Sequence, residues 1–420
     1  MAAWASTGLD GLDEILAGLQ KGDNVVWQVD QIDHFDTFVQ PFVARAAQHG
    51  RKLVYMRFAE HPPLVAPGSG VTIQDLDAST GFESFSSQVH NIITAEGREV
   101  YYVFDCLSDL LSAWATDLMI GNFFLITCPY LFELDTIAYF ALLRNNHSFK
   151  TIARIRETTQ ILLDLYNFEG RFHIHPLKVW NRYCPTMFLP HVQEDSKFVP
   201  ITTSIDAAKV ISYLSKKGLE PARRALDYWD RLFLRAEELA KNEAAAPEEK
   251  ARTIEHLCKM MIGREKRILS LAMQHFSLQD LLDIRKRMIG TGFIGGKAVG
   301  MLLANKIIAG NEALDLKRYL EPHDSFYVGS DVFYTYIVEN GWWRLRMQQK
   351  AKDGYFKVAA ELREVLLHGR FPDQIREQFQ EMMEYFGQSP IIVRSSSLLE
   401  DAYGNAFAGK YESFFCVNQG

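Results

Sequence analysis

Short β-rich runs alternate with helical patterns from about Asp23 to His191. This alternation is typical of βα units around a largely parallel sheet. Tyr101–Phe104 is apolar without interruption, as a central parallel strand that is buried on both faces requires. The sequence therefore predicts an α/β fold here, with strands at residues 24–29, 52–58, 99–104, 123–127 and 160–166.

A hairpin follows the last of these predicted strands. Glu169-Gly170 is typical of a tight turn, and the β-rich run Arg171–Val179 comes directly after it. The sheet is thus expected to end in an antiparallel ribbon. His173 and His175 alternate on this ribbon and share a face, a spacing that suits a metal ion. Because no third ligand lies nearby in the sequence, alternating residues on a solvent-facing strand are the preferred interpretation.

Two further parts follow the predicted sheet. Between residues 204 and 287 strand signals vanish and apolar residues recur at helical spacing, so we expect a helical connector. From Met288 the composition changes again and a glycine cluster appears. After this cluster the sequence predicts a helix at 298–308, a charged helix near 355–368, and short strands at 391–393 and 412–417. The expected domains are residues 1–200, 201–287 and 288–420.

Composition narrows the class of protein. The chain is 48% hydrophobic and 23% charged, which is ordinary for globular proteins. Its net charge is −7 without a long basic run, so nucleic acid is not an expected partner. The five cysteines form no C-x-x-C pair, and neither a disulfide framework nor a zinc module is expected. No signal peptide or membrane span is recognisable, which favours a cytoplasmic location.

A glycine-rich segment marks the first candidate site. Residues 290–295 match G-x-G-x-x-G, but the pattern before Gly290 is helical, which disfavours a Rossmann fold. A P-loop is disfavoured too, since Thr291 and Ala298 stand where glycine and Ser/Thr belong. What remains is the turn Gly295-Gly296-Lys297 before a helix. The free N–H groups and the dipole of that helix, together with the Lys297 ammonium, suit a phosphate. The alternative interpretation is a flexible glycine turn with a solvated lysine.

The second candidate motif lies in the last thirty residues of the sequence. It reads Ile391-Ile-Val-Arg394-Ser-Ser-Ser-Leu-Leu-Glu400-Asp401, then Asn405-Ala-Phe-Ala-Gly409-Lys-Tyr-Glu-Ser413-Phe. In order and content the two motifs resemble the nucleotide-binding domain of phosphoenolpyruvate synthases and pyruvate phosphate dikinases. The family signatures are G-G-K-G-x-N-L and V-R-S-S-x-x-x-E-D-x-x-x-x-S-F-A-G-x-x-x-[ST]-F. This chain departs from them at Ala298, Gly300 and Asn405-Ala406.

The resemblance implies the N-terminal half of an ATP-grasp domain (α+β) over about residues 288–420. It implies that ATP binds with Mg²⁺, and that Lys297 and Arg394 contact the phosphates, which suits ammonium and guanidinium chemistry. Glu400 and Asp401 would order the loop, and Ser395 would cap it or contact phosphate. Taken alone, Arg394 is equally well explained by an ion pair with one of those carboxylates.

The family reaction passes a phosphoryl group from ATP through a histidine to pyruvate. The family's metal-binding acids, its phosphohistidine domain and its pyruvate-binding barrel have no counterpart in this sequence. We therefore expect the chain to act within a longer protein or a complex. Its catalytic residues, its phosphoryl acceptor and its oligomeric state are left open.

The first part of the chain carries a second resemblance. Ser6-Thr-Gly-Leu-Asp-Gly-Leu-Asp-Glu-Ile-Leu-Ala-Gly18, then Lys21-Gly22, resembles the beginning of RecA-like ATPases of the KaiC and RadA type. Residues 50–60 resemble the strand with that family's catalytic glutamate, here Glu60, and residues 100–105 resemble the Walker B strand, which ends in Asp105. The resemblance covers about residues 5–190 and implies a RecA-like domain.

The phosphate loop of that family is missing. The chain reads Val29-Asp-Gln-Ile-Asp-His-Phe-Asp-Thr37 at this place, without glycine or lysine. Asp30, Asp33 and Asp36 would repel a triphosphate, so a structural role for Glu60 and Asp105 is preferred. We expect a degenerate RecA-like domain that acts as a scaffold or a sensor.

Three functions remain. The leading hypothesis is the ATP-binding part of a phosphoenolpyruvate-synthase-like phosphotransferase. The alternative is a regulatory or assembly protein with vestigial nucleotide folds, which binds a partner subunit or forms a homo-oligomer. An active KaiC-like ATPase is the third, and residues 30–36 argue against it.

Overall fold

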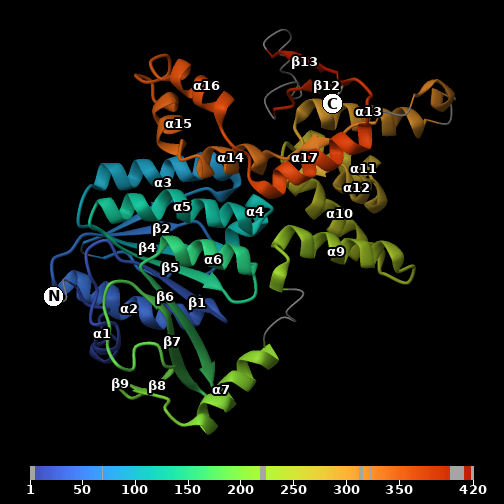
Figure 1. Cartoon of the computed structure of the whole chain (residues 1–420). Coiled ribbons are helices and arrows are strands. Elements are labelled where there is room, and N and C mark those ends of the chain that lie inside the picture. The colour runs from blue at the N-terminus through green and yellow to red at the C-terminus, as the bar shows by residue number, and fades with distance from the viewer. Residues whose placement is uncertain are drawn as a thin grey trace. The chain divides into compact units, whose positions relative to one another are not determined.

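The structure is a computed structural model, and it describes residues 5–68, 70–217, 224–311, 316–321, 324–397 and 411–417. The chain divides into two compact units, residues 1–228 and 229–420 (Figure 1). Mixed α/β structure with a large, mostly parallel sheet confirms the predicted α/β class for the first unit. Each unit is described by itself below.

The described part of the first unit holds one nine-stranded sheet in the order β3-β2-β4-β5-β1-β6-β7-β8-β9. Strands β1 to β6 are parallel, and β7 pairs antiparallel with β6 as the sequence predicts. Strands β8 and β9 extend this antiparallel part and were not predicted. Glu169 and Gly170 both have positive φ, as the predicted hairpin turn requires. The strands are β1 (Asn24–Val29), β2 (Leu53–Arg57), β3 (Val71–Asp75), β4 (Tyr101–Cys106), β5 (Ile137–Leu143), β6 (Ile161–Phe168), β7 (Arg171–Val179), β8 (His191–Glu194) and β9 (Lys197–Pro200).

Helices cover both faces of this sheet (Figure 1). Side chains alternate along β4, so Tyr101 stacks on Phe42 of α2, with ring centroids 5.3 Å apart. On the opposite face of the sheet, Phe104 packs against Phe123 of α5, with ring centroids 6.2 Å apart. Burial on both faces explains why Tyr101–Phe104 is apolar throughout. The helices of this unit are α1 (Asp10–Leu16), α2 (Ile32–Gln48), α3 (Phe82–Glu96), α4 (Leu111–Trp114), α5 (Asp117–Glu133), α6 (Phe149–Thr158) and α7 (Ser204–Lys217), with 3-10 turns η1 (Ala78–Thr80) and η2 (Leu107–Leu110).

The strand predicted at residues 123–127 is wrong. These residues lie in the middle of α5, a helix that buries side chains all round its surface. Periodicity cannot separate such a helix from a buried strand, because both read as continuous apolar runs. The strand that follows β4 is β5 instead, and its position beside β1 was not predicted.

The second unit begins with helices in the region where the sequence predicts no strand, and no strand occurs in the described residues of 204–286. Two small sheets follow: β10 and β11 pair in parallel, and β12 and β13 pair antiparallel. The elements are α9 (Tyr228–Lys241), which begins at the boundary of the units, α10 (Pro247–Met261), α11 (Lys266–His275), α12 (Leu278–Lys286), β10 (Met288–Ile289), α13 (Gly296–Ala309), η4 (Leu316–Tyr319), β11 (Tyr327–Val328), α14 (Ser330–Glu339), α15 (Trp343–Lys350), α16 (Ala359–His368), α17 (Asp373–Phe386), β12 (Ile391–Arg394) and β13 (Ser413–Cys416).

The helix and the two strands predicted around the candidate motifs are confirmed as α13, β12 and β13, within a few residues at each end. The charged helix predicted near 355–368 is shorter, since α16 begins at Ala359.

Within the described residues, no helix combines the length and the apolar character that crossing a bilayer demands.

Candidate functional site

The glycine turn connects β10 to α13. Gly290, Gly292 and Gly295 all adopt positive φ, so the segment takes a path that other residues rarely follow. Contrary to the sequence analysis, a two-residue strand and not only a helix precedes Gly290. That strand pairs with β11 alone in the described residues, whereas a Rossmann unit requires a larger parallel sheet.

The two candidate motifs meet at the beginning of α13. The Gly296 N–H donates to the carbonyl oxygen of Ser397 at 3.1 Å, and the Ala298 N–H donates to Ser396 Oγ at 3.1 Å. Ser396 Oγ in turn donates to the carbonyl oxygen of Ile294 at 3.0 Å. A Cβ atom on Gly295 would lie 1.3 Å from the Ser396 carbonyl oxygen, so only glycine allows this approach. Segments that are far apart in the sequence are thereby packed backbone to backbone.

Each motif has one basic residue within a few positions of this junction. Lys297 is half-buried in the first turn of α13. Arg394 is the last residue of β12, opposite Ser413, and its side chain is exposed. Among the described residues its guanidinium has no ion-pair partner. The two carboxylates that the sequence analysis offered as partners, Glu400 and Asp401, lie outside the described residues.

Two serines that the sequence did not single out contact the first turn of α13. Ser396 Oγ accepts from the Ala298 N–H and Ser397 adds its carbonyl oxygen, whereas the expectation that Ser395 caps the loop or contacts phosphate stays a prediction. Three consecutive serines after a strand carry no pattern that separates these roles. The one signal available was strand register, which needs the exact end of β12.

Two consecutive residues of α14, Ser330 and Asp331, accept hydrogen bonds from the glycine turn. Asp331 accepts hydrogen bonds from the N–H of Thr291, at 2.7 Å, and from its hydroxyl. The Phe293 N–H donates to Ser330 Oγ at 3.1 Å. Burial raises the pKa of Asp331 to about 6, against the lowering effect of the Thr291 hydrogen bonds. The sequence analysis missed Asp331, because an acidic residue in the first turn of a helix is usually an ordinary capping residue.

In the first unit, the position of a phosphate loop is closed. Only Asp30 and Gln31 separate β1 from α2, and no glycine-rich loop is formed. Arg144 donates to Asp30 Oδ1 at 2.7 Å and also to Asp164 on β6. The three side chains expose 13% or less of their surface. Burial raises the pKa of Asp164, and Arg144 opposes this shift. An internal ion cluster thus occupies the carboxyl end of β1, where open α/β sheets bind ligands.

Asp105, at the end of β4, is enclosed by protein donors. It is fully buried and accepts hydrogen bonds from Tyr55, from Arg57 at 2.6 Å and from the N–H groups of Phe58 and Ala59, both at 2.8 Å. These bonds link β2 to β4 and favour the structural interpretation. Glu60, the other acidic residue that the sequence offered as a catalytic candidate, is exposed.

The remaining candidates are also engaged in local structure. One ring nitrogen of His173 bonds to the carbonyl oxygen of Arg171 at 3.0 Å, and His175 bonds likewise to Phe188 at 3.1 Å. In the described residues, no group of three or more His, Cys, Asp and Glu side chains is arranged to hold a metal ion.

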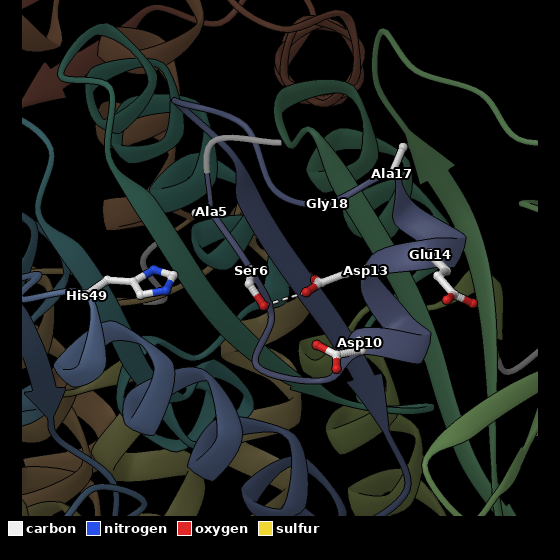
Figure 2. A pocket seen from close by; sticks show the side chains of 8 residues that line it. All are labelled: Ala5, Ser6, Asp10, Asp13, Glu14, Ala17, Gly18 and His49. Atoms are coloured by element: carbon white, nitrogen blue, oxygen red, sulfur yellow. Dashed lines mark hydrogen bonds between the residues drawn. The ribbon is translucent and has the colours of Figure 1, made fainter. Parts of the chain in front are cut away.

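The motif that begins at Ser6 lines an acidic hollow of about 470 Å³ (Figure 2). Asp10, Asp13 and Glu14 supply its carboxylates. Figure 2 shows the Ser6 side chain directed at Asp13, to which its hydroxyl donates. The Thr7 N–H also donates to Asp13, at 2.8 Å, so this motif is bonded mostly to itself.

Comparison with known families singles out the second unit. Residues 291–420 match the family model of the pyruvate phosphate dikinase AMP/ATP-binding domain. The match contains α13, β12 and β13, and therefore the junction at Gly296. It supports the resemblance to phosphoenolpyruvate synthases and pyruvate phosphate dikinases, and ATP as the ligand of this region. No curated protein matches the chain.

Proposed function

We propose that the second unit binds ATP at the junction of the two motifs and serves phosphoryl transfer toward pyruvate or a related acceptor. The observation that carries this proposal is the contact of Gly296 and Ala298 with Ser397 and Ser396, which brings both motifs to one helix N-terminus. The family match over residues 291–420 supports the choice of ATP.

Each site residue has a role in this proposal. The Lys297 ammonium is a point charge for phosphate oxygens, and the Arg394 guanidinium offers a planar fork for two of them. Gly295 and Gly296 let the segment after β12 approach the N-terminus of α13 closely, where the dipole favours anions. Glu400 and Asp401 are proposed to order the loop after β12, and Ser395 is proposed to cap that loop or contact phosphate. Mg²⁺ accompanies the nucleotide, and we assign no ligand for it.

The occupied amides restrict how ATP binds. Gly296 and Ala298 already donate to the serine segment, so phosphate binding at these N–H groups requires residues 396–397 to move. Contacts through the side chains of Lys297 and Arg394 require no such displacement. We therefore assign the main phosphate contacts to these two side chains.

We propose that the first unit is a RecA-like domain without ATP hydrolysis, acting as a scaffold or sensor. One strand, β5, separates β1 from the strand that carries Asp105. The Asp30–Arg144–Asp164 cluster supports the absence of nucleotide from this unit. The same cluster favours the second candidate function, a regulatory protein that binds a partner subunit. In either case residues 201–287 are proposed as a helical connector.

Titration calorimetry with Mg·ATP tests the proposal. Lys297→Ala and Arg394→Ala are expected to weaken binding at least tenfold each, since each removes a charge-assisted phosphate contact. Lys352→Ala and Arg363→Ala are matched controls on exposed positions of the same unit and are expected to change nothing. Equal affinities for all four variants and the unchanged chain would refute the assignment.

A further inference from the structure

We infer that Asp331 is a positioning residue, which fixes the glycine turn so that Lys297 is presented to the nucleotide. This inference rests on the proposed ATP site. Asp331 lies in the first turn of α14 and exposes 3% of its surface. One carboxylate holds both polar groups of Thr291, its N–H and its hydroxyl.

The residue next to Asp331 extends this clamp. Ser330 accepts from the Phe293 N–H at 3.1 Å, and its own N–H donates to the Phe293 carbonyl oxygen at 3.0 Å. A Cβ atom on Gly292 would lie 2.6 Å from Ser330 Oγ, so the turn presses closely on α14. Two consecutive residues of α14 therefore hold two of the three residues Thr291–Phe293, directly before the Gly-Gly-Lys segment.

The surroundings of Asp331 favour a positioning role over charge pairing. A Cβ atom on Gly290 would lie 2.9 Å from Asp331 Oδ1, so the turn packs directly on the carboxylate. Helix α17 contributes Ile375 to the apolar cluster beside the turn. The side chain of Gln378, also on α17, accepts a hydrogen bond from the Gly290 N–H at 2.8 Å. Within the described residues, none of these groups from the turn and from α17 is charged or titrates near neutral pH. A buried carboxylate without a cation is costly, and its hydrogen bonds offset that cost only while Thr291 stays in place.

The experiment compares Asp331→Ala, Asp331→Asn and Ile375→Ala in the full chain. Mg·ATP affinity is measured by calorimetry, and amide hydrogen exchange is followed over residues 291–297. Asp331→Ala removes both hydrogen bonds to Thr291, so it is expected to weaken ATP binding at least tenfold and to speed exchange at Thr291. Asp331→Asn keeps a carbonyl acceptor and is expected to restore affinity to within about twofold.

Ile375→Ala separates positioning from general stability. It opens a cavity in the cluster of Ile289, Val332 and Ile375 but removes no bond to the turn. We expect lower resistance to denaturant with an ATP affinity within about twofold of the unchanged chain. Wild-type affinity in Asp331→Ala, or equal weakening in Ile375→Ala, overturns the inference.

Two further outcomes are decisive as well. If the unchanged chain binds no ATP, the proposed function fails, and amide hydrogen exchange alone tests whether Asp331 holds the turn. Faster exchange confined to the turn in Asp331→Ala supports this role. Unaltered exchange overturns it. If Asp331→Ala does not fold, Thr291→Val replaces it, because this variant loses the hydroxyl bond alone. About threefold weaker ATP binding than in Asp331→Asn supports the inference, and equal binding overturns it.

Discussion

The Gly296 amide donates a 3.1 Å hydrogen bond to the carbonyl oxygen of Ser397, which joins the first turn of α13 to the segment that follows β12. The segment after β12 thus reaches the N-terminus of α13, directly after the glycine turn. The conformation of Gly295 makes this contact possible.

Gly295→Ala is expected to disrupt the junction. The residue has φ +83°, and the added Cβ would meet the Ser396 carbonyl oxygen. Backbone strain and the clash together are expected to cost about 3 kcal/mol and to abolish ATP binding. Chemical denaturation measures the loss. Gly300→Ala is the control, since Gly300 is helical and has no heavy atom near its Cβ position; it is expected to stabilise the chain by about 0.5–1 kcal/mol.

Arg144→Ala is expected to destabilise the first unit strongly. It would leave Asp30 and Asp164 buried side by side without their cation. Breaking a buried ion pair in this way costs about 3–5 kcal/mol. Urea unfolding with a probe in the first unit measures the effect. Arg171→Ala removes a more exposed arginine, 3.8 Å from Glu194, and is expected to cost less than about 1 kcal/mol. Similar losses for both variants would contradict the interpretation of the cluster.

The stability of the second unit is expected to fall as pH rises from about 4 to 6. Burial raises the pKa of Asp331 from 3.8 to about 6, so in this range the folded chain binds more protons than the unfolded chain. The contribution is fully present below pH 3.8 and is lost above about pH 6; it amounts to roughly 2–3 kcal/mol. Asp331→Asn is expected to flatten this part of the profile, measured by denaturant unfolding at each pH.

His191 gives the first unit the opposite pH dependence. It lies on β8 and is fully buried, and burial lowers its pKa below 6.5. The unfolded chain therefore binds the proton first, and stability is lost as pH falls below about 6.5. His191→Leu is expected to reduce this loss. A profile that stays unchanged in the variant would show that other groups, such as the buried His173, dominate.

Most of the large sheet was predictable from local sequence, and its exceptions have physical causes. β1 and β7 match the predicted ranges, because turn residues bound them and their side chains are strongly β-forming. β3 was missed although its sequence alternates apolar and polar residues, because it is only five residues long and lies at the edge of the sheet, where no residue is fully buried. The 123–127 segment failed because a helix buried on all sides carries no helical stripe.

The site was predictable only in part. Lys297 and Arg394 stand out by their motifs, and their roles as phosphate contacts stay predictions. Ser396 and Asp331 act through contacts between segments distant in the sequence, which no local pattern encodes. A buried carboxylate bonded to a turn residue becomes visible only when tertiary structure brings α14 to the glycine turn.

The most direct test of the account is amide hydrogen exchange of the full chain with and without Mg·ATP. The account predicts that ATP protects residues 294–299 and 391–397 and leaves residues 28–37 at the end of β1 unchanged. Protection at residues 28–37, or at neither place, would contradict it.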